Sequence, residues 1–244
     1  MDKSLVILFS VLGAAVLSMP IYAALGRRAD ADAEKKGTRF LLGGGDFLLH
    51  WFLWAISPIE RALVSLGATP DSMNLAGLGF GLASGVLIGF GHLQWGGWAI
   101  LVAGICDIMD GRLARAFQLA SPYGKFIDST LDRFVEAFAF LGFAWYLRAT
   151  PYGGFLATAA ICGSLLVSYA QARGETVGVH RTGGLMQRAE RLVLTCLVCL
   201  LDRPLTGAAG LAPGTAVIWV LGIIAVTTFG TAVYRSLAIA RQLR

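Results

Sequence analysis

The stretch "CDIMDGRLARAFQLASPYGKFIDSTLDR", residues 106–133, concentrates acidic side chains in a sequence that otherwise avoids charge. Of the 244 residues, 56% are hydrophobic and only 14% are charged. The stretch nevertheless holds aspartates at positions 107, 110, 128 and 132, between two long apolar segments. Carboxylates in such surroundings are costly unless something neutralises them, so the stretch is a candidate functional site.

The apolar segments around this stretch have the length of membrane spans. The mean hydropathy is +0.68, and several apolar runs reach roughly 18 to 22 residues, enough to cross a hydrocarbon core of ~30 Å. A lipid-exposed backbone must satisfy its own hydrogen bonds, so every span is expected to be a helix. We expect spans at about residues 5–25, 72–91, 97–117, 126–147, 154–172, 190–204 and 214–235. The fold class predicted is an all-α polytopic membrane bundle with a six-helix core.

The segment "GDFLLHWFLWAISPIERALVSLGATP", residues 45–70, is apolar but interrupted by polar residues and a proline. This pattern favours an amphipathic helix in the headgroup plane, with Phe47, Trp51 and Trp54 facing the acyl chains. A re-entrant or spanning segment is the alternative. We therefore expect residues 1–45 to form an N-terminal anchor with a cytoplasmic linker, and residues 46–244 to form one membrane domain.

The distribution of basic residues predicts the orientation of the chain. The net charge is +5, but the lysines and arginines lie in the loops, which argues against a nucleic-acid partner. Under the positive-inside rule, one topology satisfies nearly every charge, with the N-terminus outside and the aspartates at the cytoplasmic face. The four cysteines lie within or beside apolar runs and predict no disulfide framework.

The spacing of the aspartates predicts that they share one site. Helical periodicity places on one face the residues at i, i+3, i+4 and i+7, which are Asp107, Asp110, Gly111 and Ala114. On the next helix the residues at i, i+4 and i+8 are Gly124, Asp128 and Asp132. The turn between the helices is short enough to make them antiparallel neighbours. The four carboxylates are then expected to face one another across walls of glycine and alanine.

Clustered carboxylates of this kind suit hard divalent cations. Mg2+ takes oxygen ligands, keeps some waters and commonly shares its other positions with substrate phosphates. The small residues would give a phosphate ester room to approach the ions. Two alternatives remain open from spacing alone: the acids could pair with Arg112, Arg115 or Arg133, or they could serve the ion or proton pathway of a transporter.

The complete pattern resembles the signature of the CDP-alcohol phosphatidyltransferase family. It reads Asp107-x-x-Asp110-Gly111-x-x-Ala114-Arg115, then eight residues, then Gly124-x-x-x-Asp128-x-x-x-Asp132. The resemblance covers about residues 46–240 and implies an interfacial helix before six transmembrane helices. It also implies an active site facing the cytoplasm and a homodimer in a bacterial or archaeal cell membrane. In "TPDSMN", Thr69 and Pro70 match the "TPN" of many members, whereas Asp71 and Asn74 depart from it.

The family resemblance also assigns roles to the motif residues. It implies that a CDP-lipid such as CDP-diacylglycerol is attacked at its lipid-side phosphorus by an alcohol, releasing CMP. Mg2+ or Mn2+, two ions in all, would be held by Asp107, Asp110 and Asp128. Asp132 would touch the second ion and act as general base. The residues contacting the CDP-lipid would be Asp107, Asp110, Gly111, Ala114, Arg115 and Gly124.

The acceptor is predicted from a basic loop. Residues 173–191 carry four arginines, and guanidinium groups bind phosphate oxygens in pairs. A phosphorylated alcohol is therefore expected, although the positive-inside rule alone could account for some of these charges. "FIDSTLDRFVE" and "GLMQRAERL" look most like the branch that transfers to inositol phosphate. That likeness implies an acceptor-phosphate site formed by Arg173, Arg188, Arg191 and Arg235.

Other readings of the sequence remain possible. Within the family, glycerol 3-phosphate or another alcohol is the alternative acceptor. Outside enzymes of this type, the acids could belong to a cation or proton transporter, but the polar residues at membrane depth are concentrated in two helices. A membrane scaffold that has lost the chemistry is the third hypothesis, and the intact spacing of all four acids argues against it.

Overall fold

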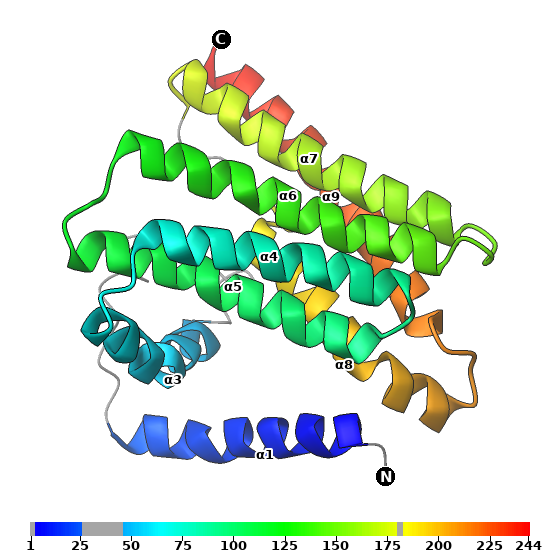
Figure 1. Cartoon of the computed structure of the whole chain (residues 1–244). Helices are drawn as coiled ribbons and strands as arrows, with labels where there is room; N and C mark the ends of the chain where they lie inside the picture. Colours follow the sequence, from blue (N-terminus) through cyan, green and yellow to red (C-terminus); the bar gives the residue numbers. More distant parts are fainter. Residues whose placement is uncertain (1–2, 26–45, 180–182) are drawn as a thin grey trace. The chain divides into compact units, whose positions relative to one another are not determined.

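The computed structural model describes residues 3–25, 46–179 and 183–244, and within these ranges the regular structure is entirely helical (Figure 1). The predicted all-α class is therefore confirmed. The helices are α1 (Lys3–Ala24), α3 (Asp46–Ser65), α4 (Pro70–Gly89), α5 (Leu93–Ala116), α6 (Pro122–Tyr146), α7 (Gly153–Thr176), α8 (Arg188–Ala209) and α9 (Thr215–Gln242).

The chain divides into two compact units, Met1–Thr69 and Pro70–Arg244. In the first unit, the Tyr22 ring of α1 lies 5.7 Å from Phe47 and 5.5 Å from Trp54, both on α3. The Trp51 indole also donates a hydrogen bond of 2.9 Å to the Ser18 hydroxyl. Aromatic packing thus joins the two helices. The expected linker before residue 46 lies outside the described residues, and the domain boundary placed there stays a prediction.

Six of the described helices are long and apolar enough to cross a membrane: α1, α3, α4, α7, α8 and α9. Helices α5 and α6, which carry the acidic stretch, are not among these six. Helix α3 qualifies by length and composition although Pro58 lies inside it. Its placement in the headgroup plane therefore stays a prediction, with a spanning helix as the alternative.

Helices α5 and α6 run antiparallel, as the short turn between them predicted: α5 ends and α6 begins at the same end of the second unit (Figure 1). The start of α6 is fixed by Ser121, whose hydroxyl accepts a hydrogen bond of 3.1 Å from the Gly124 amide. Pro122 follows at the first helical position, where its missing amide hydrogen costs nothing. Local sequence thus determines where the helix bearing Asp128 and Asp132 begins.

Glycines let α4 and α6 approach until their backbones touch. A Cβ atom on Gly85 would lie 2.3 Å from the Phe138 carbonyl oxygen, and one on Gly142 would lie 2.4 Å from the Gly85 oxygen. A Cβ on Gly81 would meet the Val135 side chain at 2.7 Å. Small residues allow this close packing between membrane helices, which otherwise lack a hydrophobic driving force for association. This contact holds α4 alongside the helix that carries two of the aspartates.

Helices α8 and α9 complete the second unit. Helix α8 extends to Ala209, past the predicted end near residue 204, and Pro204 lies within it. The buried Asp202 carboxylate accepts hydrogen bonds from the Gly214 amide at 2.8 Å and the Val217 amide at 3.4 Å. These amides belong to the start of α9, where a carboxylate is favourable because helix amide groups lack partners there.

We expect Gly85→Ala to destabilise the protein by about 1–3 kcal/mol, because the new methyl group would clash with the backbone of α6 rather than with a movable side chain. Thermal unfolding in detergent measures the change. The matched control is Gly79→Ala on the same helix, where a Cβ atom meets nothing within 4 Å. Equal melting temperatures for the two variants would contradict the close packing of α4 on α6.

Candidate active site

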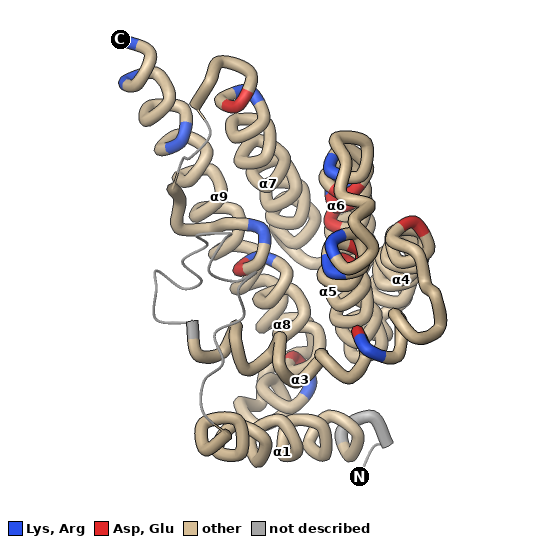
Figure 2. Tube along the Cα trace, turned by 90° about the vertical axis from the view of Figure 1, so that its left-hand side faces the viewer, with Lys and Arg blue, Asp and Glu red and all other residues tan. Residues whose placement is uncertain are grey.

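Three of the predicted acids converge. Asp107 on α5 and Asp128 and Asp132 on α6 each offer a carboxylate oxygen, and these oxygens all lie within 4.8 Å of one another. The side chains of Asp128 and Asp132 project together because they are four residues apart on a helix. Asp110 is buried in α5 and lies outside this group of three. In Figure 2, α6 carries red and blue segments while most of the bundle is tan.

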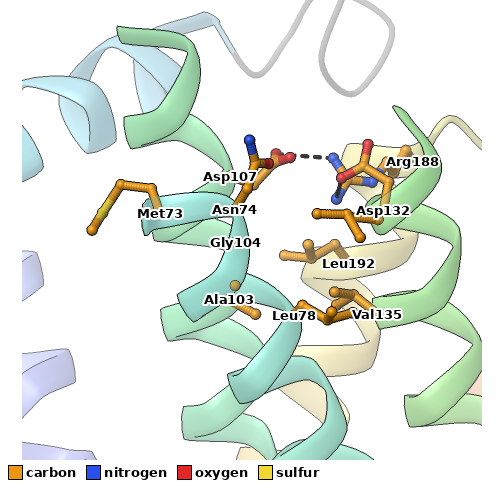
Figure 3. A pocket seen from close by; sticks show the side chains of 12 residues that line it. Met73, Asn74, Leu78, Ala103, Gly104, Asp107, Asp132, Val135, Arg188 and Leu192 are labelled. Carbon is orange, nitrogen blue, oxygen red and sulfur yellow. Dashed lines mark hydrogen bonds and ion pairs between the residues drawn. The ribbon is translucent and has the colours of Figure 1, made fainter. Parts of the chain in front are cut away.

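Arg188 joins the acids of the two helices. It is the first residue of α8, and its Nη1 atom lies 2.9 Å from Asp107 Oδ2 (Figure 3). Its Nη2 atom contacts Asp132 Oδ1. Arg133 also reaches Asp132, with 3.5 Å between Nη1 and Oδ2. One planar guanidinium therefore bridges carboxylates from α5 and α6, an arrangement that suits its forked donors.

Asp107 and Asp132 line a small pocket with two different ends. In Figure 3, Asp107, Asn74, Asp132 and Arg188 lie at one end, and apolar side chains lie at the other. The apolar lining comes from four helices and includes Leu78, Ala103, Val135 and Leu192. The enclosed volume of ≈ 20 Å³ has room for a water or an ion. A larger substrate must therefore extend beyond it.

The converging donor set fits a divalent metal ion. All three side chains offer carboxylate oxygen, the ligand type that Mg2+ and Mn2+ prefer. Carboxylates this close repel one another while ionised, and a cation between them removes that repulsion. The residues best placed to hold such an ion are thus Asp107, Asp128 and Asp132.

The other predicted CDP-lipid contacts lie near both ends of the turn between α5 and α6. Gly111 and Ala114 are half-buried in α5, and Arg115 is exposed in its last turn. A Cβ atom on Gly111 would meet only the Arg115 Nη1 atom, at 3.4 Å. Gly124 lies in the first turn of α6. The small side chains leave the backbone of α5 approachable beside Asp107 and Asp110.

The four predicted phosphate-binding arginines lie in three different settings. Arg188 contacts the carboxylates, whereas Arg173 is exposed in the last turn of α7. Arg191 is only 1% exposed and forms a two-pronged ion pair with Glu136. Arg235 is 7% exposed and donates hydrogen bonds of 3.1 Å to the carbonyls of Gly183 and Val167. Arg181, also in the basic loop, lies outside the described residues.

Sequence reasoning did not single out Glu136 or assign a role to Asn74, yet Asn74 lines the pocket and Glu136 contacts the buried Arg191. Glu136 had a sequence signal, because Gly124, Asp128, Asp132 and Glu136 continue one row at steps of four residues. For Asn74 the one sequence signal was its departure from the usual family pattern. Its position beside Asp107 depends on the packing of α4, which no local motif encodes.

Comparison with known proteins identifies the family. The model of the CDP-alcohol phosphatidyltransferase family matches residues 69–218, and the chain belongs to this family. It is therefore an integral membrane transferase, as the signature predicted. The match also decides against the transporter alternative that the sequence left open.

Several of the similar proteins are phosphatidylinositol phosphate synthases. The phosphatidylinositol phosphate synthase of Streptomyces avermitilis is 33% identical over 204 residues, covering 79% of this chain and 80% of that protein. The crystal structure of the Mycobacterium tuberculosis phosphatidylinositol phosphate synthase with CDP-DAG bound is 27% identical, with a TM-score of 0.65, covering 75% of this chain and 92% of that one. The crystal structure of the same enzyme in complex with manganese and citrate is 26% identical, with a TM-score of 0.66. This match covers 75% of this chain and 88% of that one.

We expect Asp128→Asn to weaken divalent-ion binding by about tenfold or more, because it removes one of the three converging carboxylates. Electron paramagnetic resonance of Mn2+ titrated into the purified protein measures the affinity. Glu175→Gln is the control, since this glutamate on α7 contacts Lys125 at 3.6 Å and the Gln171 amide at 3.1 Å, and it is not one of the three converging acids. Undiminished Mn2+ affinity in Asp128→Asn would contradict the metal site.

Proposed function

We propose that this chain transfers the phosphatidyl group of CDP-diacylglycerol to inositol phosphate and releases CMP. The observation that carries the proposal is the convergence of three carboxylates, two of which line the polar end of a pocket together with Arg188. The polar end suits the charged diphosphate of a CDP-lipid, whose lipid tail must lie outside the small pocket. The related synthases, one of them with CDP-DAG bound, support the same pair of substrates.

Two divalent ions, Mg2+ or Mn2+, are part of this proposal. Asp107, Asp128 and Asp132 would hold them, with Asp110 one turn further along α5. When bound, the ions would polarise the phosphoryl oxygens and stabilise the negative charge on the leaving CMP. The manganese in the related structure supports this assignment.

Asp132 is proposed as the general base. The acceptor hydroxyl loses its proton to the Asp132 carboxylate while its oxygen attacks the lipid-side phosphorus. A new phosphorus–oxygen bond forms, and the bond between that phosphorus and CMP breaks. Asp132 is suited to this role because it is half-buried and held in place by Arg188. A carboxylate that is already oriented reduces the entropic cost of reaching the transition state.

The nucleotide side of the CDP-lipid is proposed to lie against the turn between α5 and α6. Gly111, Ala114 and Gly124 would leave space for the diphosphate, and Arg115 would pair with its negative charge. This placement keeps the diphosphate next to Asp107 and Asp110 on the same face of α5.

The acceptor phosphate is proposed to bind at Arg188, with Arg173, Arg191 and Arg235 completing the basic side of the site. Because Arg188 contacts Asp132, a phosphate held by Arg188 brings its hydroxyl-bearing ring next to the base. We place this site at the cytoplasmic face, as the positive-inside rule predicts, and we expect a homodimer.

An acceptor screen tests the proposed function. Purified protein with Mg2+ and radiolabelled CDP-diacylglycerol should release CMP with inositol phosphate, and more slowly or not at all with glycerol 3-phosphate, inositol or serine. Arg188→Gln should raise the KM for inositol phosphate by on the order of tenfold, because a charge-assisted hydrogen bond is lost. CMP release with none of these acceptors, or preference for an unphosphorylated alcohol, would contradict the proposal.

We expect Asp132→Asn to lower kcat by about 10²- to 10⁴-fold, the usual contribution of a positioned base. The amide cannot accept the hydroxyl proton, while folding should survive, and kcat is measured at saturating Mn2+ because one of the three converging carboxylates is lost. Single-turnover CMP release and Mn2+ binding, measured on the same preparation, separate these effects. Turnover near that of the unmodified protein would exclude Asp132 as the base.

A further inference from the structure

Glu136 and Arg191 form a buried ion pair one helical turn from the carboxylate cluster. Glu136 follows Asp132 by four residues on α6, so the two side chains share a face. Arg191 Nε lies 2.5 Å from one Glu136 oxygen, and Nη2 lies 3.2 Å from the other. Arg191 is 1% exposed. This two-pronged contact joins α6 to α8, with the Arg191 side chain shielded from water and Glu136 half-buried.

The same arginine fixes the loop that precedes α8. Arg191 Nη1 donates a hydrogen bond of 3.2 Å to the Met186 carbonyl. The Thr231 hydroxyl of α9 accepts a hydrogen bond of 3.1 Å from the Met186 amide. Arg235 Nε, also on α9, donates a hydrogen bond of 3.1 Å to the Gly183 carbonyl. Met186 is therefore bound at both its amide and its carbonyl, by side chains from two helices.

The fit of this loop leaves little freedom for movement. A Cβ atom on Gly184 would lie 2.4 Å from the Thr231 Cγ2 atom, so the loop backbone presses directly against α9. The Met186 side chain is buried. Two residues later, Arg188 begins α8 with its guanidinium on Asp107 and Asp132. The position of the Arg188 backbone thus depends on where Met186 is held.

We propose that Glu136 is a positioning residue for acceptor binding: by holding Arg191, and through it Met186, it sets where Arg188 meets the acceptor phosphate. Without the Glu136 charge, Arg191 would be a buried cation lacking its carboxylate partner and would leave its position. The Met186 carbonyl and the start of α8 would then shift together. Because it concerns the acceptor phosphate, this role rests on the proposed function.

The test measures two Michaelis constants in Glu136→Gln. The KM for inositol phosphate should rise on the order of tenfold, since a small displacement of a positioning group is costly. The KM for CDP-diacylglycerol should stay within about twofold, because the proposed CDP-lipid contacts lie on α5 and the first turn of α6. Glu136→Asp keeps the carboxylate and should recover part of the loss. Glu175→Gln, which removes an exposed carboxylate, should leave both constants unchanged.

The outcomes separate this role from the proposed function. If the unmodified protein releases no CMP with inositol phosphate, the proposed function fails, whatever the variants do. If it is active and Glu136→Gln keeps the normal KM for inositol phosphate, the positioning role is wrong. A merely structural role would lower the active fraction and the melting temperature while leaving both constants alone, and that result would also overturn the inference.

A second variant covers the case in which Glu136→Gln does not fold. Glu136→Gln combined with Arg191→Gln removes both charges, so no unpaired ion remains in the interior. The double variant should fold and show a KM for inositol phosphate raised at least as much as in Glu136→Gln, because both the charged donor to the Met186 carbonyl and the proposed phosphate contact of Arg191 are lost. A normal KM in the folded double variant would contradict the role of the Glu136–Arg191 pair.

Discussion

The constraint on which this structure depends is the close approach of three carboxylates in a bundle whose interior is mostly apolar. Asp107, Asp128 and Asp132 bring their oxygens within 4.8 Å of one another, and such a cluster needs positive charge to be stable at membrane depth. Arg188 provides one positive charge. Divalent ions, which prefer oxygen ligands of this kind, would provide the others. The chemistry of the family follows from the same requirement, because ions held by oxygen ligands readily share phosphate groups.

The rest of the second unit keeps this cluster in place. Ser121 and Pro122 determine where α6 begins, and the glycine contact between Gly85 and Gly142 holds α4 against it. Helix α8 supplies Arg188 at its first residue, and polar contacts hold Met186 two residues before that helix starts. The acids come from two helices and their arginine partner from a third. Backbone contacts and buried hydrogen bonds place these side chains, because burial of apolar surface has no preferred direction.

The sequence predicted the features that local periodicity encodes. Apolar runs located the helices, although α5 and α6 are not among the six that qualify as membrane spans whereas α3 is. Spacings of three and four residues predicted the shared face of the acids. Contacts between helices could not be predicted from the sequence. The spacing grouped Asp110 with the other three acids, whereas the oxygens that converge in the structure belong to Asp107, Asp128 and Asp132. The hydrogen bonds from Arg191 and Arg235 to loop carbonyls join residues far apart in the chain or across a turn, so no motif reveals them. Glu136 could have been found, because it continues the row of Asp128 and Asp132.

The most direct test of the central claim is the location of a bound metal ion. Crystals of the protein grown with Mn2+ and CDP-diacylglycerol would give an anomalous difference map in which manganese is identified by its own scattering. We expect manganese between α5 and α6, bonded at about 2 Å to carboxylate oxygens of Asp107, Asp128 and Asp132. Manganese bound elsewhere, with these three carboxylates contacting only arginine side chains, would contradict the account.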